Sequence, residues 1–317
     1  QHPPGSRSHP LRASRRTVTN KRKAASGAVV LLAVAAATTY FATTTTAQPS
    51  PLIIIVMENK SYVNLTSHAA FVPYELGLAD QGRRFTHYSE SPSPSLPNYL
   101  LMASGETCDK AGTDAITAGQ ITVCPTTVWN QLESAGVSWS VYMDDMPSPC
   151  SAPATTKNLT ADGGMGDIYA LKHNPATPFT SVYGDQTLCK AHVLPYTSFN
   201  PAALPAVSFI SPGICDDQHG STNLVFVNCY PKTDALYKRG DDWLAANVPP
   251  MLAAGASVIV TYDGPSSAMY TVLVGSVVTP GTDATPYTHC SLLGAIEDRY
   301  GLTKLGCAQT ATALPLS

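Results

Sequence analysis

The stretch Pro51-Leu-Ile-Ile-Ile-Val-Met-Glu-Asn59 decides the fold class. Its apolar part is a continuous run rich in β-branched residues, which is typical of a strand buried on both faces of a parallel sheet. A half-exposed strand would instead alternate apolar and polar residues. The run ends at the acid and amide pair Glu58-Asn59. The stretch therefore predicts the first strand of an α/β domain, with polar side chains at its carboxyl end.

Strand-like and helix-like patterns alternate after this run. Further strands are expected over residues 84–88, 138–143, 206–211, 257–262 and 271–278, and helices over 73–81, 96–104, 126–135, 241–254 and 289–300. This alternation predicts a single doubly wound α/β domain, in which helices flank a mostly parallel sheet. Stretches rich in proline, glycine and threonine near 105–125 and 145–205 predict irregular insertions.

The first 47 residues have the composition of an export signal. Seven basic residues precede residue 24, and an uncharged stretch of mainly Ala, Val, Leu and Thr covers 24–47. This order predicts a secretory signal peptide that is cleaved near Gln48. The alternative is a retained anchor helix, for which the apolar stretch is only marginally long. We therefore expect a secreted or extracytoplasmic protein whose single mature domain covers residues 48–317.

The expected mature domain is acidic. Seven of the 19 Lys and Arg residues, but none of the 22 Asp and Glu residues, lie within the first 47, so 12 basic and 22 acidic side chains leave a net charge of −10. The sequence has no basic stripe for nucleic acid and no basic amphipathic helix for anionic lipid. It therefore argues against a nucleic-acid-binding protein and predicts no stable membrane span in the mature form.

All eight cysteines lie in this acidic part of the chain. Their even number, together with an export signal, favours disulfides over free thiols. They form no CxxC pair and no Cys/His zinc spacing, which argues against a structural zinc site. The simplest pairing joins sequence neighbours: Cys108–Cys124, Cys150–Cys189, Cys215–Cys229 and Cys290–Cys307.

The segment Ser91-Pro-Ser-Pro-Ser-Leu-Pro-Asn98 leads into the helix expected over 96–104. Its prolines disfavour helix before them, so the chain should arrive extended and place Ser95 at the helix start. Unpaired backbone N–H groups and the positive end of the helix dipole would suit a phosphate there. On local grounds alone, Ser95 is better interpreted as a helix N-cap. Its interpretation as a nucleophile depends on the rest of the chain.

Three of the apolar strands stop at or just before acids. Glu58 follows the first strand, Asp217 lies shortly after the strand over 206–211, and Asp263 follows the strand over 257–262. Ligands of open α/β sheets bind outside the carboxyl ends of strands, so we expect these side chains at one edge. Carboxylates brought together repel one another, and a divalent metal ion would compensate them. Taken singly, each acid is more commonly a turn or cap residue.

Three histidines stand near turn residues or helix starts: His173, His219 and His289. Histidine binds phosphate as a cation, ligates metals and protonates leaving oxygens, although an isolated histidine is more often structural. The sequence contains no Gly-x-Ser-x-Gly elbow and no P-loop. These absences argue against an α/β-hydrolase esterase and against a P-loop nucleotidase.

In their order and spacing, these motifs resemble the phosphoesterase family of secreted bacterial acid phosphatases and nonspecific phospholipases C, within the alkaline phosphatase superfamily. The resemblance is carried by Val56-Met-Glu-Asn59, Pro94-Ser-Leu-Pro-Asn-Tyr-Leu100, Lys172-His-Asn-Pro175, Pro205 to His219, Gly240-Asp-Asp-Trp-Leu244, Val258 to Asp263 and His289 to Leu302. It implies an alkaline-phosphatase-like fold with disulfide-bonded insertions, one phosphoesterase domain over residues 48–317, and a divalent metal ion of unspecified identity.

The resemblance also implies roles for individual residues. Metal-binding positions match Glu58, Asn59, Ser95 and Asp263, and Ser95 is also the nucleophile. Positions around the phosphate match Asn98, His173 and Asp217, and His219 and His289 match residues that act on the phosphate or its leaving group. One departure stands out. Related sequences usually carry two acids after the late strand, whereas here Asp263 is followed by Gly264, which implies a missing ligand or a missing support for one.

Together these features predict a secreted, metal-dependent acid phosphatase that hydrolyses phosphate monoesters through a phosphoserine intermediate. Its substrate would be a small phosphate ester, such as a phosphoinositide or a sugar phosphate. A phospholipase C-like phosphodiesterase is the alternative enzyme, although the chain is short for one. A non-catalytic secreted binding protein on a phosphoesterase scaffold is the alternative that Gly264 suggests.

Overall fold

The elements of the chain follow the predicted alternation. The computed structural model describes residues 49–90, 94–116, 124, 126–152, 169–222, 226–264 and 268–317. The strands are β1 (Leu52–Met57), β2 (Arg83–Tyr88), β3 (Trp139–Met143), β4 (Val193–Pro195), β5 (Val207–Ser211), β6 (Ser257–Tyr262), β7 (Val272–Val274) and β8 (Gly281–Tyr287). The helices are α1 (Tyr62–Ser67), α2 (Pro73–Gln81), α3 (Ser95–Ser104), α4 (Val128–Ser134), α5 (Thr180–Tyr183), α6 (Gln186–His192), α7 (Asp234–Ala253) and α8 (His289–Tyr300), with the 3₁₀ turn η2 (Leu171–His173) before α5. The predicted leader lies outside the described residues.

One mostly parallel sheet organises these elements, as the sequence predicts. Its strand order is β4-β3-β5-β1-β6-β7-β2-β8. The strand that opened the sequence, β1, is central and pairs in parallel with β5 and β6. Every residue of these three strands is buried, which explains their uninterrupted apolar runs. Only β7 runs antiparallel to its neighbours within the described sheet.

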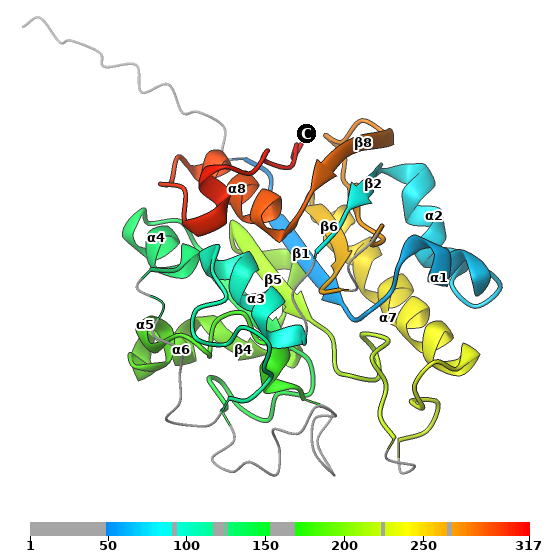
Figure 1. The fold of residues 1–317 in the computed structure, drawn as a ribbon, viewed down its shortest axis with the longest axis horizontal. Coiled ribbons are helices and arrows are strands. Elements are labelled where there is room, and N and C mark those ends of the chain that lie inside the picture. Colours follow the sequence, from blue (N-terminus) through cyan, green and yellow to red (C-terminus); the bar gives the residue numbers. More distant parts are fainter. Residues whose placement is uncertain are drawn as a thin grey trace, which may run out of the picture. The chain divides into compact units, whose positions relative to one another are not determined.

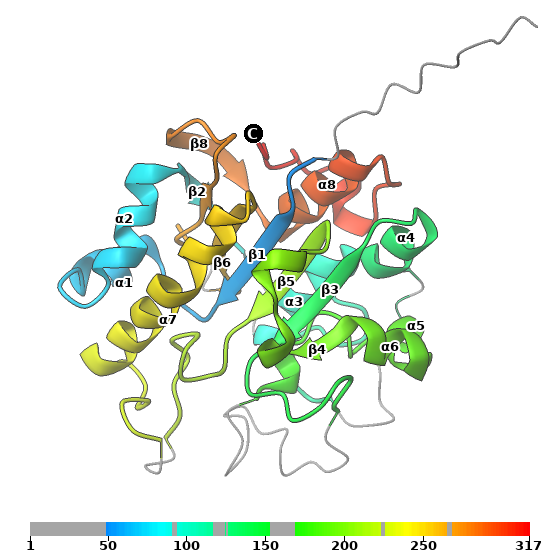
Figure 2. The same ribbon diagram turned by 180° about the vertical axis from the view of Figure 1, so that it is seen from behind.

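Helices cover both faces of the sheet (Figures 1 and 2). On one face α3, α4 and α8 contact one another. On the other face α2 packs against α7, and α7 packs against β6. The arrangement is therefore doubly wound, with one layer of helices on each face of the sheet. None of the described helices combines the length and the apolar character that crossing a bilayer requires.

Some boundaries differ from the prediction. The strand expected over 271–278 is only the short β7, and the strands β4 and β8 were not predicted. The helix expected over 241–254 starts at Asp234, where the Thr233 side chain accepts a hydrogen bond from the Leu236 N–H. β4 and β8 are the two edge strands and β7 lies between β6 and β2, whereas the central strands β5, β1 and β6 agree with the prediction.

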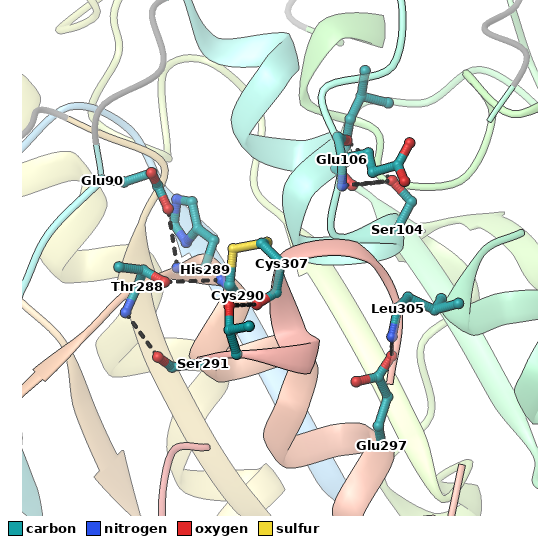
Figure 3. The surroundings of a disulfide bond; sticks show 12 residues. Glu90, Ser104, Glu106, Thr288, His289, Cys290, Ser291, Glu297, Leu305 and Cys307 are labelled. Carbon is teal, nitrogen blue, oxygen red and sulfur yellow. Dashed lines mark hydrogen bonds between the residues drawn. A yellow bond between two sulfur atoms is a disulfide. The ribbon is translucent and has the colours of Figure 1, made fainter. Parts of the chain in front are cut away.

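The predicted disulfide pairing is confirmed at all four pairs, and no cysteine of the structure is free. Two of the bonds, Cys108–Cys124 and Cys215–Cys229, lie in the segments that follow α3 and β5, and Cys150–Cys189 joins the segment after β3 to helix α6. The fourth, Cys290–Cys307, joins the first turn of α8 to the segment after that helix (Figure 3). Disulfides therefore hold the insertions that the hydrophobic pattern alone left unassigned.

Candidate active site

The carboxyl ends of β5, β1 and β6 bring the predicted acids together. The Glu58 N–H donates to the Asp217 carbonyl at 2.8 Å, and the Asp263 N–H donates to the Met57 carbonyl at 3.0 Å. The side chains of Glu58, Asp217 and Asp263 are all at most 1% exposed. The three acids therefore meet at one sheet edge, as expected for strands that lie side by side in the order β5-β1-β6.

Helix α3 starts beside these acids. Its N-cap is Pro94, which has extended backbone angles and no side-chain cap. Ser95 is the first helical residue, and its hydroxyl donates to Glu58 Oε2 at 3.2 Å. The local interpretation of Ser95 as an N-cap is therefore wrong, because its hydroxyl contacts the acid cluster and not the backbone of its own helix.

The start of α3 is less open than the sequence suggested. The Leu96 N–H, expected to be unpaired, donates to Asp114 Oδ1 at 2.9 Å. The other oxygen of this carboxylate lies 3.3 Å from Lys172 Nζ. Pro97, in the same turn, has no N–H. A carboxylate thus occupies part of the position at which a helix N-terminus binds an anion, and neither Asp114 nor Lys172 was singled out from the sequence.

Glu58 is the centre of the polar contacts. Its Oε2 accepts hydrogen bonds from Ser95 and, at 2.8 Å, from Asn59 Nδ2. Its Oε1 accepts one from the Tyr99 hydroxyl at 3.1 Å. Asn59 adopts a left-handed φ of 55°, and its backbone N–H donates to Asp263 Oδ1 at 3.1 Å. Asparagine tolerates this backbone conformation better than most residues, so the motif fixes both acids.

His173 lies between two of the carboxylates. Its Nε2 is 2.9 Å from Glu58 Oε1, and its Nδ1 is 3.1 Å from Asp217 Oδ2. Neither contact has the alignment of a hydrogen bond, so both ring nitrogens are buried without one among the described residues. Ligand atoms of these three residues lie within 4.8 Å of one another. Carboxylate oxygens and imidazole nitrogens that are close together but not aligned for hydrogen bonds are suited to binding a cation.

Burial raises the pKa of all three acids. In Glu58 the nearby charge of Lys172 opposes this increase, and in Asp217 the interaction with His173 does so. In Asp263 the charge of Glu58 adds to burial and raises the pKa to about 7. The three carboxyls therefore resist ionising together without a compensating charge. Carboxylate, amide and hydroxyl oxygens with one imidazole are a donor set that fits a divalent metal ion.

His219 lies near His173, with the ring centroids 5.7 Å apart. Its Nδ1 is 2.7 Å from the Gly220 carbonyl. A carbonyl only accepts, so Nδ1 carries the proton of the neutral ring, and Nε2 has the free lone pair. Burial, assisted by the charge of Lys172, lowers the pKa of His219 to about 3. The ring is therefore neutral in the free protein at mildly acidic pH.

His289 is the first residue of α8 and is fully buried. Its Nε2 donates to the Asp263 carbonyl at 2.8 Å, and its Nδ1 accepts from the Tyr88 hydroxyl at 3.0 Å. Its backbone N–H donates to Glu90 at 3.2 Å, next to the Cys290–Cys307 disulfide (Figure 3). Both ring nitrogens are thus hydrogen-bonded within the protein. The bond from Nε2 holds the backbone carbonyl of Asp263 in place.

Asn98 and Gly264 border the cluster on a further side. Asn98 lies one turn after Ser95 on α3 and is 2% exposed. A Cβ atom placed on Gly264 would lie 3.6 Å from Asn59 Oδ1 and 3.9 Å from Asn98 Nδ2. With this pair, the structure brings all nine residues singled out from the sequence to one place.

Four further side chains of the site were missed by sequence reasoning. Lys60 is buried, and its ammonium donates to the carbonyls of Glu58 at 3.2 Å and Gln218 at 2.8 Å. The others are Tyr99, Asp114 and Lys172. Three of the four directly adjoin a motif residue in the sequence, so the neighbours of Asn59, Asn98 and His173 were a usable signal. Asp114 lies in an irregular segment and offered none.

The fold and the site define the class of protein. A solved structure from Vibrio parahaemolyticus, described as a protein in the alkaline phosphatase superfamily, superposes with a TM-score of 0.52 at 9% identity, covering 85% of this chain and 71% of its own. The fold is therefore that of the alkaline phosphatase superfamily. Within it, a model described as the Phosphoesterase family matches residues 69–263. The chain belongs to the Phosphoesterase family.

Named relatives share this sequence region. An acid phosphatase of Aspergillus fumigatus is 28% identical over 72% of this chain and 51% of its own length. A phosphatidylinositol-3-phosphatase of Mycobacterium tuberculosis is 26% identical over 82% of this chain and 80% of its own length. The chain thus spans about half of the fungal relative and most of the mycobacterial one.

Proposed function

We propose that this chain is a secreted, metal-dependent acid phosphatase that hydrolyses phosphate monoesters through a phosphoserine at Ser95. One observation carries the proposal: the Ser95 hydroxyl lies at the buried start of α3, 3.2 Å from Glu58, in a chain of the Phosphoesterase family. Relatives named as acid phosphatases support the reaction type. Four disulfides and the signal-like leader support export.

The residues that would hold the metal are Glu58, Asn59, Ser95 and Asp263. His173 and Asp217 are further candidate ligands. His173 Nε2 lies 2.9 Å from Glu58 Oε1, and ligand atoms of all three residues lie close together. A bound divalent cation would lower the pKa of the serine hydroxyl and offset the charge of the carboxylates.

Ser95 Oγ attacks the phosphorus in line, and the bond between phosphorus and the leaving oxygen breaks. Glu58 Oε2 already accepts the hydrogen bond of this hydroxyl at 3.2 Å, so it receives the proton. Asn98, one turn along α3, holds a nonbridging phosphate oxygen, and Lys172 offsets the charge that develops at the helix start. Water then attacks the phosphoserine, which releases phosphate and restores the Ser95 hydroxyl.

The two late histidines have different tasks in this scheme. His219 is neutral before substrate binds, and its Nε2 is available because Nδ1 binds the Gly220 carbonyl. The negative charge of a bound ester raises the pKa of His219 again, so the acid form that protonates the leaving oxygen arises in the complex. His289 acts instead as a positioning residue, because it fixes the backbone of Asp263.

The direct test replaces the nucleophile. Ser95→Ala should lower phosphate release from p-nitrophenyl phosphate at pH 5 by about 10³-fold or more, since the intermediate can no longer form. The matched control is Ser104→Ala, which removes a buried hydroxyl of the same helix that bonds the Leu100 carbonyl. Near-normal turnover by folded Ser95→Ala would sink the assignment.

The same assay distinguishes the alternatives. Faster hydrolysis of p-nitrophenyl phosphorylcholine than of p-nitrophenyl phosphate would favour a phospholipase C-like phosphodiesterase. Absence of phosphate release between pH 4 and 8, with and without divalent cations, would favour a non-catalytic binding protein. Loss of turnover in a chelator and its recovery with one divalent cation would support metal dependence and identify the ion.

A further inference from the structure

A cavity adjoins the candidate site. Its volume is about 650 Å³, and the described residues that line it include Asn59, Lys60, His68, His219, Lys232 and Tyr237. Asn59 and His219 belong both to this cavity and to the cluster around Ser95. A phosphate ester bound at Ser95 with its leaving oxygen near His219 would therefore have its alcohol portion next to the cavity. The volume lies within the range of about 300–1,000 Å³ that is usual for small-molecule sites.

The lining of this cavity is basic, although the chain as a whole carries a net charge of −3. Lys60 and Lys232 contribute to it, whereas no Asp or Glu is among its described lining residues. The carboxylate of Asp234 lies outside this lining. It is 57% exposed and 3.8 Å from His68 Nε2. The cavity is therefore complementary in charge to an anionic group.

The two lysines contribute in different ways. The Lys60 ammonium is buried, donates to two backbone carbonyls and interacts with the charges of the site acids, so it does not offer a bound anion a direct contact. Lys232 is exposed, and within the described part of the chain its ammonium has no carboxylate partner. Lys232 is thus the cation that a bound anion would contact.

Aromatic contacts hold the shape of the cavity. His68 stacks on Tyr237 with ring centroids 3.9 Å apart and an angle of 14° between the rings. Lys60 Nζ lies 5.4 Å from the centre of the same Tyr237 ring. His68 Nδ1 is also 2.9 Å from the Asn64 carbonyl. A wall fixed before binding reduces the entropy that a ligand must offset.

We propose that the preferred substrates are phosphate monoesters whose alcohol carries a second anionic group, a phosphate or a carboxylate, and that this group binds in the cavity against Lys232. The inference rests on the phosphatase function proposed above and names its substrate class. The cavity volume of about 650 Å³ accommodates an alcohol of the size of a sugar. The exposed ammonium of Lys232 and the rigid Tyr237 wall favour such a ligand.

The test compares two substrates that differ only in the second anion. In 6-phosphogluconate a carboxylate replaces the terminal hydroxymethyl group of sorbitol 6-phosphate. The wild type should prefer 6-phosphogluconate in kcat/KM by about fivefold or more, and Lys232→Gln should reduce this preference to about twofold or less. The ratio is an internal control, because loss of folded protein lowers both values equally. Lys190→Gln, which removes an exposed lysine of α6, should keep the wild-type ratio.

A second arm identifies the source of the anion. Phosphatidylinositol 3-phosphate in phosphatidylcholine vesicles offers a lipid headgroup with a second phosphate, and soluble glycerophosphoinositol 3-phosphate offers the same headgroup without the acyl chains. Dependence on Lys232 with either one supports the proposal and names the source. Equal ratios in wild type and Lys232→Gln, with no dependence in either arm, would overturn it. If the wild type fails to hydrolyse p-nitrophenyl phosphate, the proposed function itself fails, which is a separate result.

Discussion

Gly264 is the residue at which this chain departs from the two acids that the family resemblance implies after the late strand. The structure shows that the position is not closed to a side chain. A Cβ atom there would make ordinary contacts of 3.6 Å with Asn59 and 3.9 Å with Asn98, and Gly264 is not among the described residues with positive φ. The glycine is therefore not required by the backbone, and it leaves space beside two site amides.

Gly264→Asp should tighten the binding of a divalent cation by about tenfold, because it adds a carboxylate beside the proposed ligands Asn59 and Asp263. Isothermal titration calorimetry on the chelator-treated protein measures this change directly. Gly264→Asn is the matched control, since it has the same shape without the charge. Equal affinities in wild type and both variants would show that this position does not face the bound ion.

At the residue scale, sequence reasoning found the groups that carry the chemistry. Acids at strand ends and a serine at a helix start can be read from the chain, because the ends of elements are visible as breaks in the hydrophobic pattern. It could not show that Asp114 reaches the start of α3 or that Lys172 is buried beside it. Those contacts join segments far apart in sequence, and a lone lysine resembles a surface residue.

At the scale of elements, α2 links two of the segments that carry site residues. The Glu75 carboxylate, fully buried on α2, accepts from Gln218 Nε2 at 3.0 Å and from the Tyr262 hydroxyl. Tyr262 also lies 3.1 Å from Gln218 Oε1. Gln218 stands between Asp217 and His219, and Tyr262 directly precedes Asp263. A helix with no site residue of its own therefore holds the acids of two strand ends in register.

Glu75→Ala should lower kcat by about tenfold or more with little change in KM, because the site loses geometry and not a substrate contact. It should also lower the free energy of unfolding by about 1–3 kcal/mol, since buried partners lose their hydrogen bonds. Glu75→Gln, which keeps an acceptor, should recover most of kcat. Asp80→Ala, an exposed acid of the same helix, is the control. Equal kcat in the Ala and Gln variants would contradict a positioning role.

The elements that sequence reasoning misplaced have physical reasons. Helix α7 continues through Gly240, although glycine normally weakens a helix. A glycine stands at this position because a Cβ atom there would lie 2.4 Å from the side chain of Gln218. The glycine marks close packing and not a helix end. β8 is a mainly exposed edge strand with a glycine, a proline and polar residues, so no apolar period reveals it. Edge strands depend on their neighbour more than on their own pattern.

For the whole molecule, the buried carboxyls outnumber His219, whose lowered pKa of about 3 acts on stability in the opposite sense, and they set the response to pH. Burial raises the pKa of Glu75, Asp263 and Glu297 to about 7, and it also raises that of Glu58 and Asp217. An acid whose pKa is higher in the folded than in the unfolded state binds more protons when folded. For Glu75, the contribution to folding stability is fully present below the unfolded-state pKa of about 4.5. It is lost as pH rises through the folded-state pKa of about 7.

The metal-free protein should therefore be more stable in acid than at neutral pH. Between pH 4.5 and 7.5 the free energy of unfolding in a chelator should fall by several kcal/mol, on the order of 1 kcal/mol for each group. Urea unfolding at both pH values measures the fall. A divalent cation should make this fall in free energy smaller, because it compensates the charge of the site acids. Glu75→Gln should also make the fall smaller, by the contribution of the Glu75 carboxyl. A free energy that rises with pH in the chelator would contradict this account.

The Cys290–Cys307 disulfide has a consequence for where the protein becomes competent. It closes beside His289, whose ring holds the Asp263 carbonyl. In a reducing cytoplasm this bond would not form, and the start of α8 would lack a covalent restraint next to the acid cluster. The phosphatase that we propose would thus reach its working geometry only after export, and the phosphate esters of the cell that makes it would be spared during synthesis.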